Sequence, residues 1–256
     1  ILLVGRKSFI SKNYKKYSKF KKKISTTSYK KISKVNMSKY THIFNLSIDP
    51  QSKHRDYNFT NRIDEKICKK IRNNNIIYIY PSTRFVYEKN KKNYFYQLNK
   101  IRTEKTIKKL IKHNYLILRI GNLLAFDLSN KSLFITKMLH TLKNKNEINF
   151  DIKKKTFKDF ITFEYFAKCL DILIEKRIVG TYNFSSGKKM NIYSIGKSLI
   201  KGYGKGKISF SKSLKDDSFV LDNSKLKKIV KFKLYKKDIL DYCYMVGQKL
   251  KKYNKS

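Results

Sequence analysis

The chain has 256 residues, 41% hydrophobic and 14% aromatic, so it can bury a full core as one domain or slightly more and is not a disordered tail. It contains no run of about eighteen apolar residues and no charged and apolar leader before the first strand, which favours a protein without a membrane partner. Its three scattered cysteines form no CxxC pair, which argues against a disulfide framework and favours the cytoplasm. The formal charge of +43 fits a polyanion partner, but it comes mostly from lysines spread along the whole chain, which favours solvated faces over a specific nucleic-acid site.

The first half of the chain has the pattern of a parallel sheet with crossover helices. Short runs rich in Ile, Val, Phe and Tyr predict strands, and the stretches between them place Ile and Leu at intervals of three and four residues. The predicted strands are residues 1–4, 23–27, 41–47, 75–82 and 115–120, and the predicted crossover helices are residues 64–74 and 97–113. These elements predict an α/β fold with a doubly wound parallel sheet.

The second half has a different texture and predicts a small C-terminal α+β cap. Helical spacing covers residues 133–144, 163–176 and 237–253, and strands are expected near residues 147–152 and 207–211. We expect residues 1–122 to form the sheet domain, with residues 150–180 returning to it, and residues 123–149 and 181–256 to form the substrate-binding cap. Open parallel sheets bind ligands outside the carboxyl ends of their strands, so a cap there would close a cleft.

Candidate reactive side chains follow the strand predicted at residues 75–82. Thr83 comes directly after it, and Tyr96 opens a helical segment in which Lys100 lies four residues further on. Residues four apart share a helix face, so the phenol of Tyr96 and the ammonium of Lys100 would point into the same cleft. A nearby lysine favours the phenolate and lowers the pKa of a tyrosine, which suits proton exchange near neutral pH, and Thr83 could donate a hydrogen bond to the same substrate oxygen.

The Tyr-x-x-x-Lys spacing by itself carries little weight in a chain so rich in both residues. About four matches are expected by chance, and five occur, beginning at Tyr17, Tyr87, Tyr96, Tyr193 and Tyr203. Only the match at Tyr96 begins a strongly helical segment directly after a strand that ends in Ser-Thr. Its context therefore makes it the candidate.

An ordered set of segments resembles a known enzyme family. The segments are "ILLVGRKSFIS", "HIFNLS", "IIYIYPSTRFVY", "YQLNKIRTEK", "LILRIGN", "FKDFITFEYFAKCL" and "GTYNFSSGKKMNIYSI". Their order and intervals are similar to those of extended short-chain dehydrogenase/reductases, the NAD-dependent epimerase/dehydratase family that acts on nucleotide sugars. Two short intervals are similar to its dTDP-4-dehydrorhamnose reductase branch. The resemblance covers nearly the whole chain and implies a Rossmann-like sheet, NAD or NADP as cofactor and a nucleotide sugar as substrate.

The resemblance also implies roles for individual residues. Tyr96 would be the catalytic acid/base, Lys100 would anchor the nicotinamide ribose and lower the tyrosine pKa, and Thr83 would be their hydroxyl partner at the substrate. Asn122 would face the sugar nucleotide, and Glu104 would be a structural pair on the outer face of its helix. The residues implied for cofactor binding are Gly5, Ser8, Phe9, Ile10, Thr27, Asn45, Leu46, Ser47 and Lys100.

The phosphate loop departs from the family's pattern. Ser8 and Ser11 stand where the second and third glycines of Gly-x-x-Gly-x-x-Gly would be. The second glycine lets the backbone approach the pyrophosphate, and the third lets helix and strand pack closely. Ser8 is expected either to donate to a phosphate or to cap the helix, so the change lowers the expected affinity without excluding the geometry.

The expected choice between the two cofactors depends on the charges near the loop. The segment at residues 24–31 has no carboxylate to bind the adenosine ribose of NAD. The basic residues nearby are Arg6, Lys7, Lys30 and Lys31. They suit the additional phosphate of NADP, so we expect a slight preference for NADP.

Several alternatives remain open on the sequence. Net reduction needs only Thr83, Tyr96 and Lys100, and epimerisation would need the hydride returned. Dehydration needs further acid/base groups, for which the following segment offers only Glu88, so it ranks last. A dinucleotide-binding regulatory protein without turnover is a second hypothesis, and a basic nucleic-acid-binding protein is a third. We expect no metal site, because the four histidines lack ligand spacing, and the resemblance adds a homodimer as an option.

Overall fold

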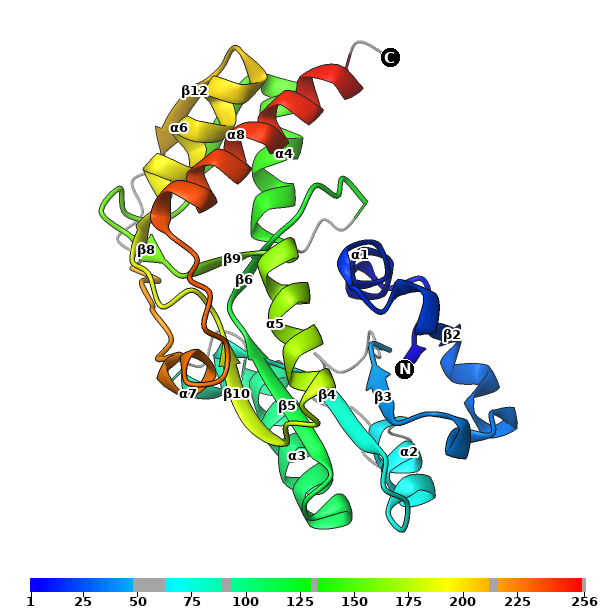
Figure 1. Cartoon of the computed structure of the whole chain (residues 1–256). Coiled ribbons are helices and arrows are strands. Elements are labelled where there is room, and N and C mark those ends of the chain that lie inside the picture. Colours follow the sequence, from blue (N-terminus) through cyan, green and yellow to red (C-terminus); the bar gives the residue numbers. More distant parts are fainter. Residues whose placement is uncertain (48–62, 89–93, 130–132, 212–215, 255–256) are drawn as a thin grey trace. The chain divides into compact units, whose positions relative to one another are not determined.

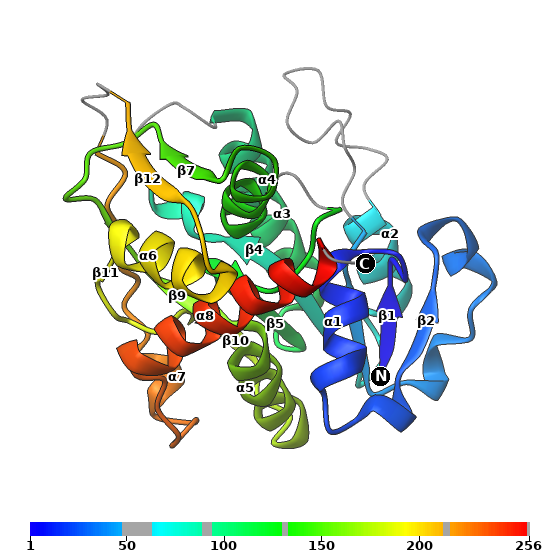
Figure 2. The same cartoon turned by 90° about the horizontal axis from the view of Figure 1, so that it is seen from above.

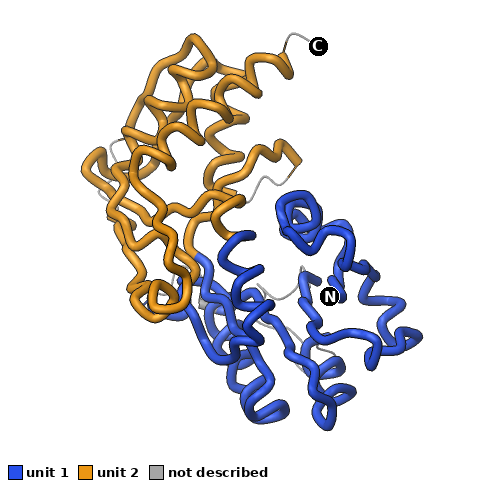
Figure 3. Tube along the Cα trace, in the orientation of Figure 1, with its two compact units in different colours: residues 1–120, 167–183 blue, residues 121–166, 184–256 orange. Residues whose placement is uncertain are grey.

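The computed structural model describes residues 1–47, 63–88, 94–129, 133–211 and 216–254. By their contacts they form two compact units, residues 1–120 with 167–183 and residues 121–166 with 184–256 (Figure 3). The functional domains expected from the sequence stay a prediction, because compactness does not show which unit binds a substrate. None of the described helices is long and apolar enough to cross a membrane.

The first unit is built on a six-stranded sheet with the order β10-β5-β4-β3-β1-β2 (Figures 1 and 2). The strands are β1 (Leu2–Val4), β2 (Ser25–Thr27), β3 (His42–Asn45), β4 (Ile77–Thr83), β5 (Tyr115–Ile120) and β10 (Gly180–Phe184). Every neighbouring pair from β2 to β5 is parallel. The chain runs from β1 to β2 on one side and continues with β3 on the other side of β1, so the predicted doubly wound sheet is confirmed. The switch point between β1 and β3 is where such sheets bind ligands.

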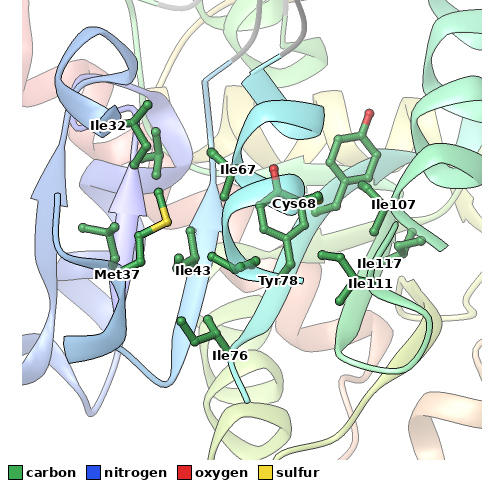
Figure 4. Close-up of a cluster of buried hydrophobic side chains, with 14 residues drawn as sticks. Ile32, Met37, Ile43, Ile67, Cys68, Ile76, Tyr78, Ile107, Ile111 and Ile117 are labelled. Atoms are coloured by element: carbon green, nitrogen blue, oxygen red, sulfur yellow. The ribbon is translucent and has the colours of Figure 1, made fainter. Parts of the chain in front are cut away.

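Alternation along the strands supplies apolar side chains to helices on both faces of this sheet. The helices are α1 (Phe9–Tyr17), α2 (Ile63–Ile71), α3 (Tyr94–Ile111) and the C-terminal part of α5 (Phe163–Glu175). Ile43 and Tyr78 join the apolar side chains of α2 and α3 in one buried cluster (Figure 4). Phe44, next along β3, meets the ring of Tyr14 on α1 at 6.2 Å. The Tyr14 hydroxyl donates to buried Asp171 of α5 at 2.6 Å, which ties α1 to α5.

The second unit is a small α+β assembly of short strands and three longer helices. Its strand pairs are β6 (Asn122–Leu124) with β9 (Phe160–Thr162), β7 (Glu147–Phe150) with β12 (Lys207–Phe210) and β8 (Phe157–Lys158) with β11 (Met190–Asn191). Its helices are α4 (Phe134–Lys145), α6 (Ile192–Tyr203), the short α7 (Ser224–Lys227) and α8 (Lys236–Tyr253). Helices α6 and α8 touch backbone to backbone, because a Cβ on Gly202 would lie 2.0 Å from the Tyr244 carbonyl oxygen.

Two local features of this unit differ from the sequence analysis. The prediction had no helix at residues 192–203, although Asn191 caps α6 by accepting a hydrogen bond from the Tyr193 amide at 2.8 Å. The "GYGKGK" segment at residues 202–207 has the glycine content of a flexible turn. Its first two residues instead complete α6, and Gly204 caps the helix in the left-handed region at φ 95°. Within α6, Gly202 lies against the backbone of Tyr244 in α8.

Candidate active site

Gly5 directly follows β1, in a conformation and a space that only glycine fits. Its φ is +97°, and a Cβ there would lie 2.9 Å from both the Leu46 carbonyl carbon and the Ser47 amide nitrogen. Its own amide donates to the Thr27 carbonyl at 2.8 Å. The turn therefore brings together the carboxyl ends of β1, β2 and β3, and with them four of the residues predicted for the cofactor.

Ser8 replaces a glycine at a position where the backbone does not need one. Its φ of −65° and ψ of 149° are open to any residue, and its Oγ accepts a hydrogen bond from the Ser11 amide at 3.1 Å. Of the two roles expected for Ser8, the structure shows the helix cap. Phe9 and Ile10 follow as the first two residues of α1, both half-buried.

The Asn45 side chain is turned into the interior rather than left available at the end of β3. Its amide donates to Asp64 at 2.8 Å, and its carbonyl oxygen accepts from the Ser47 amide at 3.1 Å. The Tyr78 hydroxyl also donates to Asp64, at 2.6 Å. Asn45 therefore holds the backbone of the loop that follows β3. The nearby Ser47 has a buried Oγ with no hydrogen-bond partner among the described residues.

Thr83, the last residue of β4, and Tyr96 of α3 both contact Phe85. Thr83 caps the turn η6 (Arg84–Tyr87), and its Oγ1 accepts from the Phe85 amide at 3.3 Å, which leaves the hydroxyl proton available. The Phe85 ring meets the half-buried Tyr96 ring edge-on at 6.1 Å. The predicted pair therefore comes from β4 and α3 of the same unit.

Lys100 lies one helical turn after Tyr96 and is buried, with 8% of its surface exposed. Its Nζ lies 5.7 Å from the centre of the Tyr96 ring and donates to the Pro81 carbonyl at 2.8 Å. Burial alone would lower the pKa of Lys100, but the electrostatic effects of Tyr80, Tyr96 and Asp64 outweigh it and raise the pKa. The ammonium therefore stays charged beside Tyr96, as the shared helix face predicted.

Glu104 contradicts the prediction that it lies on the outer face of its helix. It is only 4% exposed, and it accepts from the Ser82 hydroxyl at 2.5 Å. Arg119 of β5 binds both of its carboxylate oxygens, with Nε 3.1 Å from Oε1 and Nη2 2.6 Å from Oε2. The outer-face prediction was wrong because Glu104 follows Lys100 by four residues, which places it on the stripe of α3 that faces the sheet.

Arg119 also connects Glu104 to Tyr87, in the turn that follows Thr83. Arg119 Nη1 donates to the Tyr87 hydroxyl at 2.7 Å, and this hydroxyl donates to Asn183 Oδ1 at 2.9 Å. The hydrogen bonds to Glu104 and Tyr87 raise the pKa of Arg119 against its partial burial. Sequence reasoning missed Arg119 and Tyr87, because nothing local to either residue indicates a partner on another strand.

Asn122, the residue expected to face a sugar nucleotide, belongs to the second unit. It begins β6, is half-buried, and its side-chain amide donates to the Asp159 carbonyl at 3.2 Å. The Asp159 carboxylate is fully buried and accepts from the Ser186 and Gly187 amides at 2.9 and 3.0 Å. Asn122 is therefore held beside the buried, hydrogen-bonded Asp159 of that unit.

No protein-family model and no curated protein matches this sequence. Solved structures share its fold over nearly the full length, and they are Rossmann-type enzymes. The UDP-N-acetylglucosamine 4-epimerase from Methanobrevibacter ruminantium M1 superposes with a TM-score of 0.78 at 18% identity, covering 96% of each chain. The dTDP-4-dehydrorhamnose reductase from Clostridium acetobutylicum has a TM-score of 0.73 at 14% identity, covering 94% of this chain and 97% of its own.

A third similar structure was solved with a dinucleotide. RMD from Pseudomonas aeruginosa, complexed with NADPH, has a TM-score of 0.76 at 14% identity and covers 98% of this chain and 99% of its own. At these identities the likeness establishes the fold. It confirms the Rossmann-like architecture that the ordered sequence segments predicted.

Proposed function

We propose that the protein is an NAD(P)-dependent enzyme of the extended short-chain dehydrogenase/reductase type that acts on a nucleotide sugar. The observation that carries this proposal is the buried, charged Lys100 beside Tyr96, in the unit whose switch point carries the Gly5 turn. Similar structures include a UDP-glucuronic acid 4-epimerase from Bacillus cereus in complex with UDP-glucuronic acid and NAD, which supports the substrate class.

The residues around the Gly5 turn fit a dinucleotide. The missing Cβ of Gly5 keeps the approach to Leu46 and Ser47 open, and the amides at the start of α1 attract a phosphate. The Oγ of Ser47, buried and without a hydrogen-bond partner in the part of the chain that the structure describes, is a polar atom that a ligand could satisfy. The exposed side chains of Arg6 and Lys7 suit the additional phosphate of NADP, the cofactor we favour slightly.

The proposed chemistry divides between the cofactor and three side chains. The bound nicotinamide would supply or accept a hydride at a sugar carbon. Tyr96 would exchange a proton with the oxygen on that carbon, and Thr83 would donate its free hydroxyl proton to the same oxygen. The Lys100 ammonium would stabilise negative charge on the Tyr96 oxygen. Asn122 would contact the sugar nucleotide.

Among the reactions that these parts allow, reduction or epimerisation is favoured over dehydration. Dehydration needs another acid/base group, and the one carboxylate in the segment after Thr83, Glu88, forms an ion pair with Arg84. Reduction uses only the three side chains and the cofactor. The cytoplasmic location and the homodimer stay predictions, and size-exclusion chromatography with light scattering would test the latter.

One observation favours a second candidate, a dinucleotide-binding protein without turnover. The Ser8 hydroxyl oxygen already accepts the hydrogen bond of the Ser11 amide. This amide is one of those at the helix N-terminus that a pyrophosphate would approach. A bound phosphate would have to share or displace this cap. Binding weak enough to prevent turnover would follow if the cap persisted.

The decisive experiment titrates NADPH and NADH and then assays keto-sugar nucleotides. The chain has no tryptophan, so the fluorescence of the reduced cofactor is read against a low background. We expect Tyr96→Phe to keep cofactor binding and to lower kcat by about a hundredfold or more. Tyr193→Phe, which alters an exposed Tyr-x-x-x-Lys match in the second unit, should change neither.

Three outcomes separate the candidates. Absence of binding to either cofactor would refute both. Binding without activity toward any nucleotide sugar, with Tyr96→Phe unchanged, would support the non-catalytic candidate. Activity that survives Tyr96→Phe would show that the proton passes through another group.

A further inference from the structure

Asp64 of α2 is turned toward the sheet of the first unit. It lies in the first turn of the helix, three residues before Ile67 and four before Cys68, and both of these side chains are buried in the apolar cluster (Figure 4). Residues three and four apart share a helix face, so Asp64 lies on the face of α2 that packs on the sheet. Apolar packing of the helix therefore holds this carboxylate in place.

One oxygen of the Asp64 carboxylate binds two neighbouring strands. Asp64 Oδ1 accepts from the Asn45 side-chain amide at 2.8 Å and from the Tyr78 hydroxyl at 2.6 Å. Asn45 is the last residue of β3, Tyr78 belongs to β4, and both are buried. Burial raises the pKa of Tyr78, so the phenol keeps the proton that it donates. Hydrogen bonds to a charged acceptor are stronger than those between neutral groups, so this oxygen ties α2 to β3 and β4.

The carboxylate also decides which way the Asn45 amide points. A carboxylate accepts hydrogen bonds and donates none, so the NH2 group of Asn45 must face Asp64. The Asn45 carbonyl oxygen is thereby directed to the loop after β3, where it accepts from the Ser47 amide at 3.1 Å. In the reversed orientation, two oxygens would face each other at one end of the side chain and two N–H donors at the other.

The loop held in this way is the one that faces the Gly5 turn. The Leu46 amide donates to the Val4 carbonyl at 2.8 Å, which pairs the start of the loop with β1. A Cβ on Gly5 would lie 2.9 Å from both the Leu46 carbonyl carbon and the Ser47 amide nitrogen. The loop therefore packs directly on the turn that would receive the dinucleotide, and a shift of its backbone would change that surface.

We propose that Asp64 is a positioning residue for the cofactor site, which acts through the Asn45 side chain. Asn45 in turn holds the Ser47 amide and keeps the loop after β3 in the conformation that faces the dinucleotide. This role rests on the proposed function, because it affects turnover only if a dinucleotide binds at the Gly5 turn. It adds α2 to the elements that form the cofactor site.

The test compares two carboxylates in the first turn of α2. Asp64→Ala removes the acceptor of Asn45, so the loop populates the binding conformation less, and affinity for the reduced cofactor should fall about tenfold. Glu65→Ala is the matched control, because it deletes the same charge from the same end of the helix. Glu65 pairs with the exposed Lys69 at 2.7 Å, and its loss should leave cofactor affinity unchanged. An equal loss of affinity in both variants would overturn the proposal.

A second variant separates the hydrogen-bond acceptor from the charge. The charge of Asp64 also acts on Lys100, so its removal could by itself change cofactor binding. Asp64→Asn loses this charge but keeps a carbonyl oxygen to replace Oδ1, which receives both hydrogen bonds, so most of the affinity should remain. A loss as large as that of Asp64→Ala would overturn the proposal, because the charge would then be responsible.

A double-mutant cycle tests whether Asp64 acts through Asn45. Asp64→Ala should lower cofactor affinity in the native chain and have no further effect in Asn45→Ala. Additive losses would overturn the proposal. Circular dichroism checks that each variant folds, and Asp64→Ser, whose hydroxyl is one bond shorter than the carboxylate, takes the place of Asp64→Ala if that variant does not fold.

A measurement without cofactor tests the contact itself. The Ser47 amide is hydrogen-bonded to Asn45, and its exchange with deuterium can be followed by NMR of ¹⁵N-labelled protein. Asp64→Ala should speed this exchange about tenfold, whereas Glu65→Ala should leave it unchanged. Unchanged exchange in Asp64→Ala would overturn the inference. If the native protein binds neither cofactor, the proposed function fails, and the exchange of this amide still decides whether Asp64 holds the loop.

Discussion

Two ion pairs of equal length in the first unit allow burial to be tested separately from distance. Arg119 Nη2 lies 2.6 Å from Glu104 Oε2, and Lys19 Nζ lies 2.6 Å from Glu175 Oε2. The Glu104 side chain is 5% exposed, whereas that of Glu175 is 55% exposed. The perturbation is the same in each case, replacement of the carboxylate by alanine.

The two replacements should differ several-fold in their effect on the free energy of unfolding. Glu104→Ala leaves the Arg119 guanidinium without its carboxylate and the buried Ser82 hydroxyl without its acceptor, which should cost about 3–5 kcal/mol. Glu175→Ala removes a solvent-screened pair and should cost less than about 1 kcal/mol. For a chain of this size each kcal/mol corresponds to roughly 2–4 °C in Tm, so Glu104→Ala should lose about 10 °C.

The assay is urea unfolding and thermal melting, both followed by far-ultraviolet circular dichroism. Both pairs belong to the first unit, so their effects are read in the same transition. Glu104→Gln, which keeps an acceptor for Ser82, should fall between the other two variants. Equal costs for Glu104→Ala and Glu175→Ala would refute the reasoning, because they would show that burial of this pair contributes nothing.

Two further predictions test the phosphate turn and a buried histidine. Gly5→Ala places a methyl group 2.9 Å from the backbone of Leu46 at a φ of +97°. This variant should destabilise the protein by at least about 1 kcal/mol and reduce its NAD(P) affinity. In the control Gly121→Ala the nearest atom lies at 3.6 Å, so stability should change little. Urea unfolding and cofactor titration check both, and a Gly5→Ala variant that binds normally would contradict the proposed site. Burial and the charge of Arg177 lower the pKa of His42 from 6.5 to about 4. Between these pH values the unfolded chain therefore binds more protons than the folded one. The stability of the protein should fall as the pH drops from 6.5 toward 4. In His42→Gln the Tm should decrease less over this pH range than in the native protein. An identical dependence of Tm on pH in both would contradict the role of His42.

The sequence predicted those parts of the site that are local along the chain. The spacing of Tyr96 and Lys100 placed both on one face of a helix, and the helix α3 bears this out. The apolar run before Gly5 predicted a strand and a turn, and the positive φ of Gly5 explains why glycine stands there. Helix and strand periodicity depend on a few consecutive residues, which is why they could be read directly.

The partners of these residues could not be predicted in the same way. Glu104 matches the family's helix, but its partners Ser82 and Arg119 lie 22 and 15 residues away on two different strands. Strand alternation puts Tyr80 and Ser82 on the same face of β4, and only the folded structure places Lys100 and Glu104 of α3 against this face. Likewise, Ser8 had two expected roles, and only its backbone angles and the Ser11 amide distinguish them.

By itself the sequence determined a doubly wound α/β chain with glycine at its first turn and a tyrosine and a lysine one helical turn apart. These features follow from side-chain periodicity and from the steric limits of the backbone, both of which act over short distances along the chain. Only the tertiary structure decided that Lys100 donates to the Pro81 carbonyl and that Glu104 faces inward to Arg119. Those contacts depend on the register of α3 against β4 and β5, which is set by packing of the whole unit.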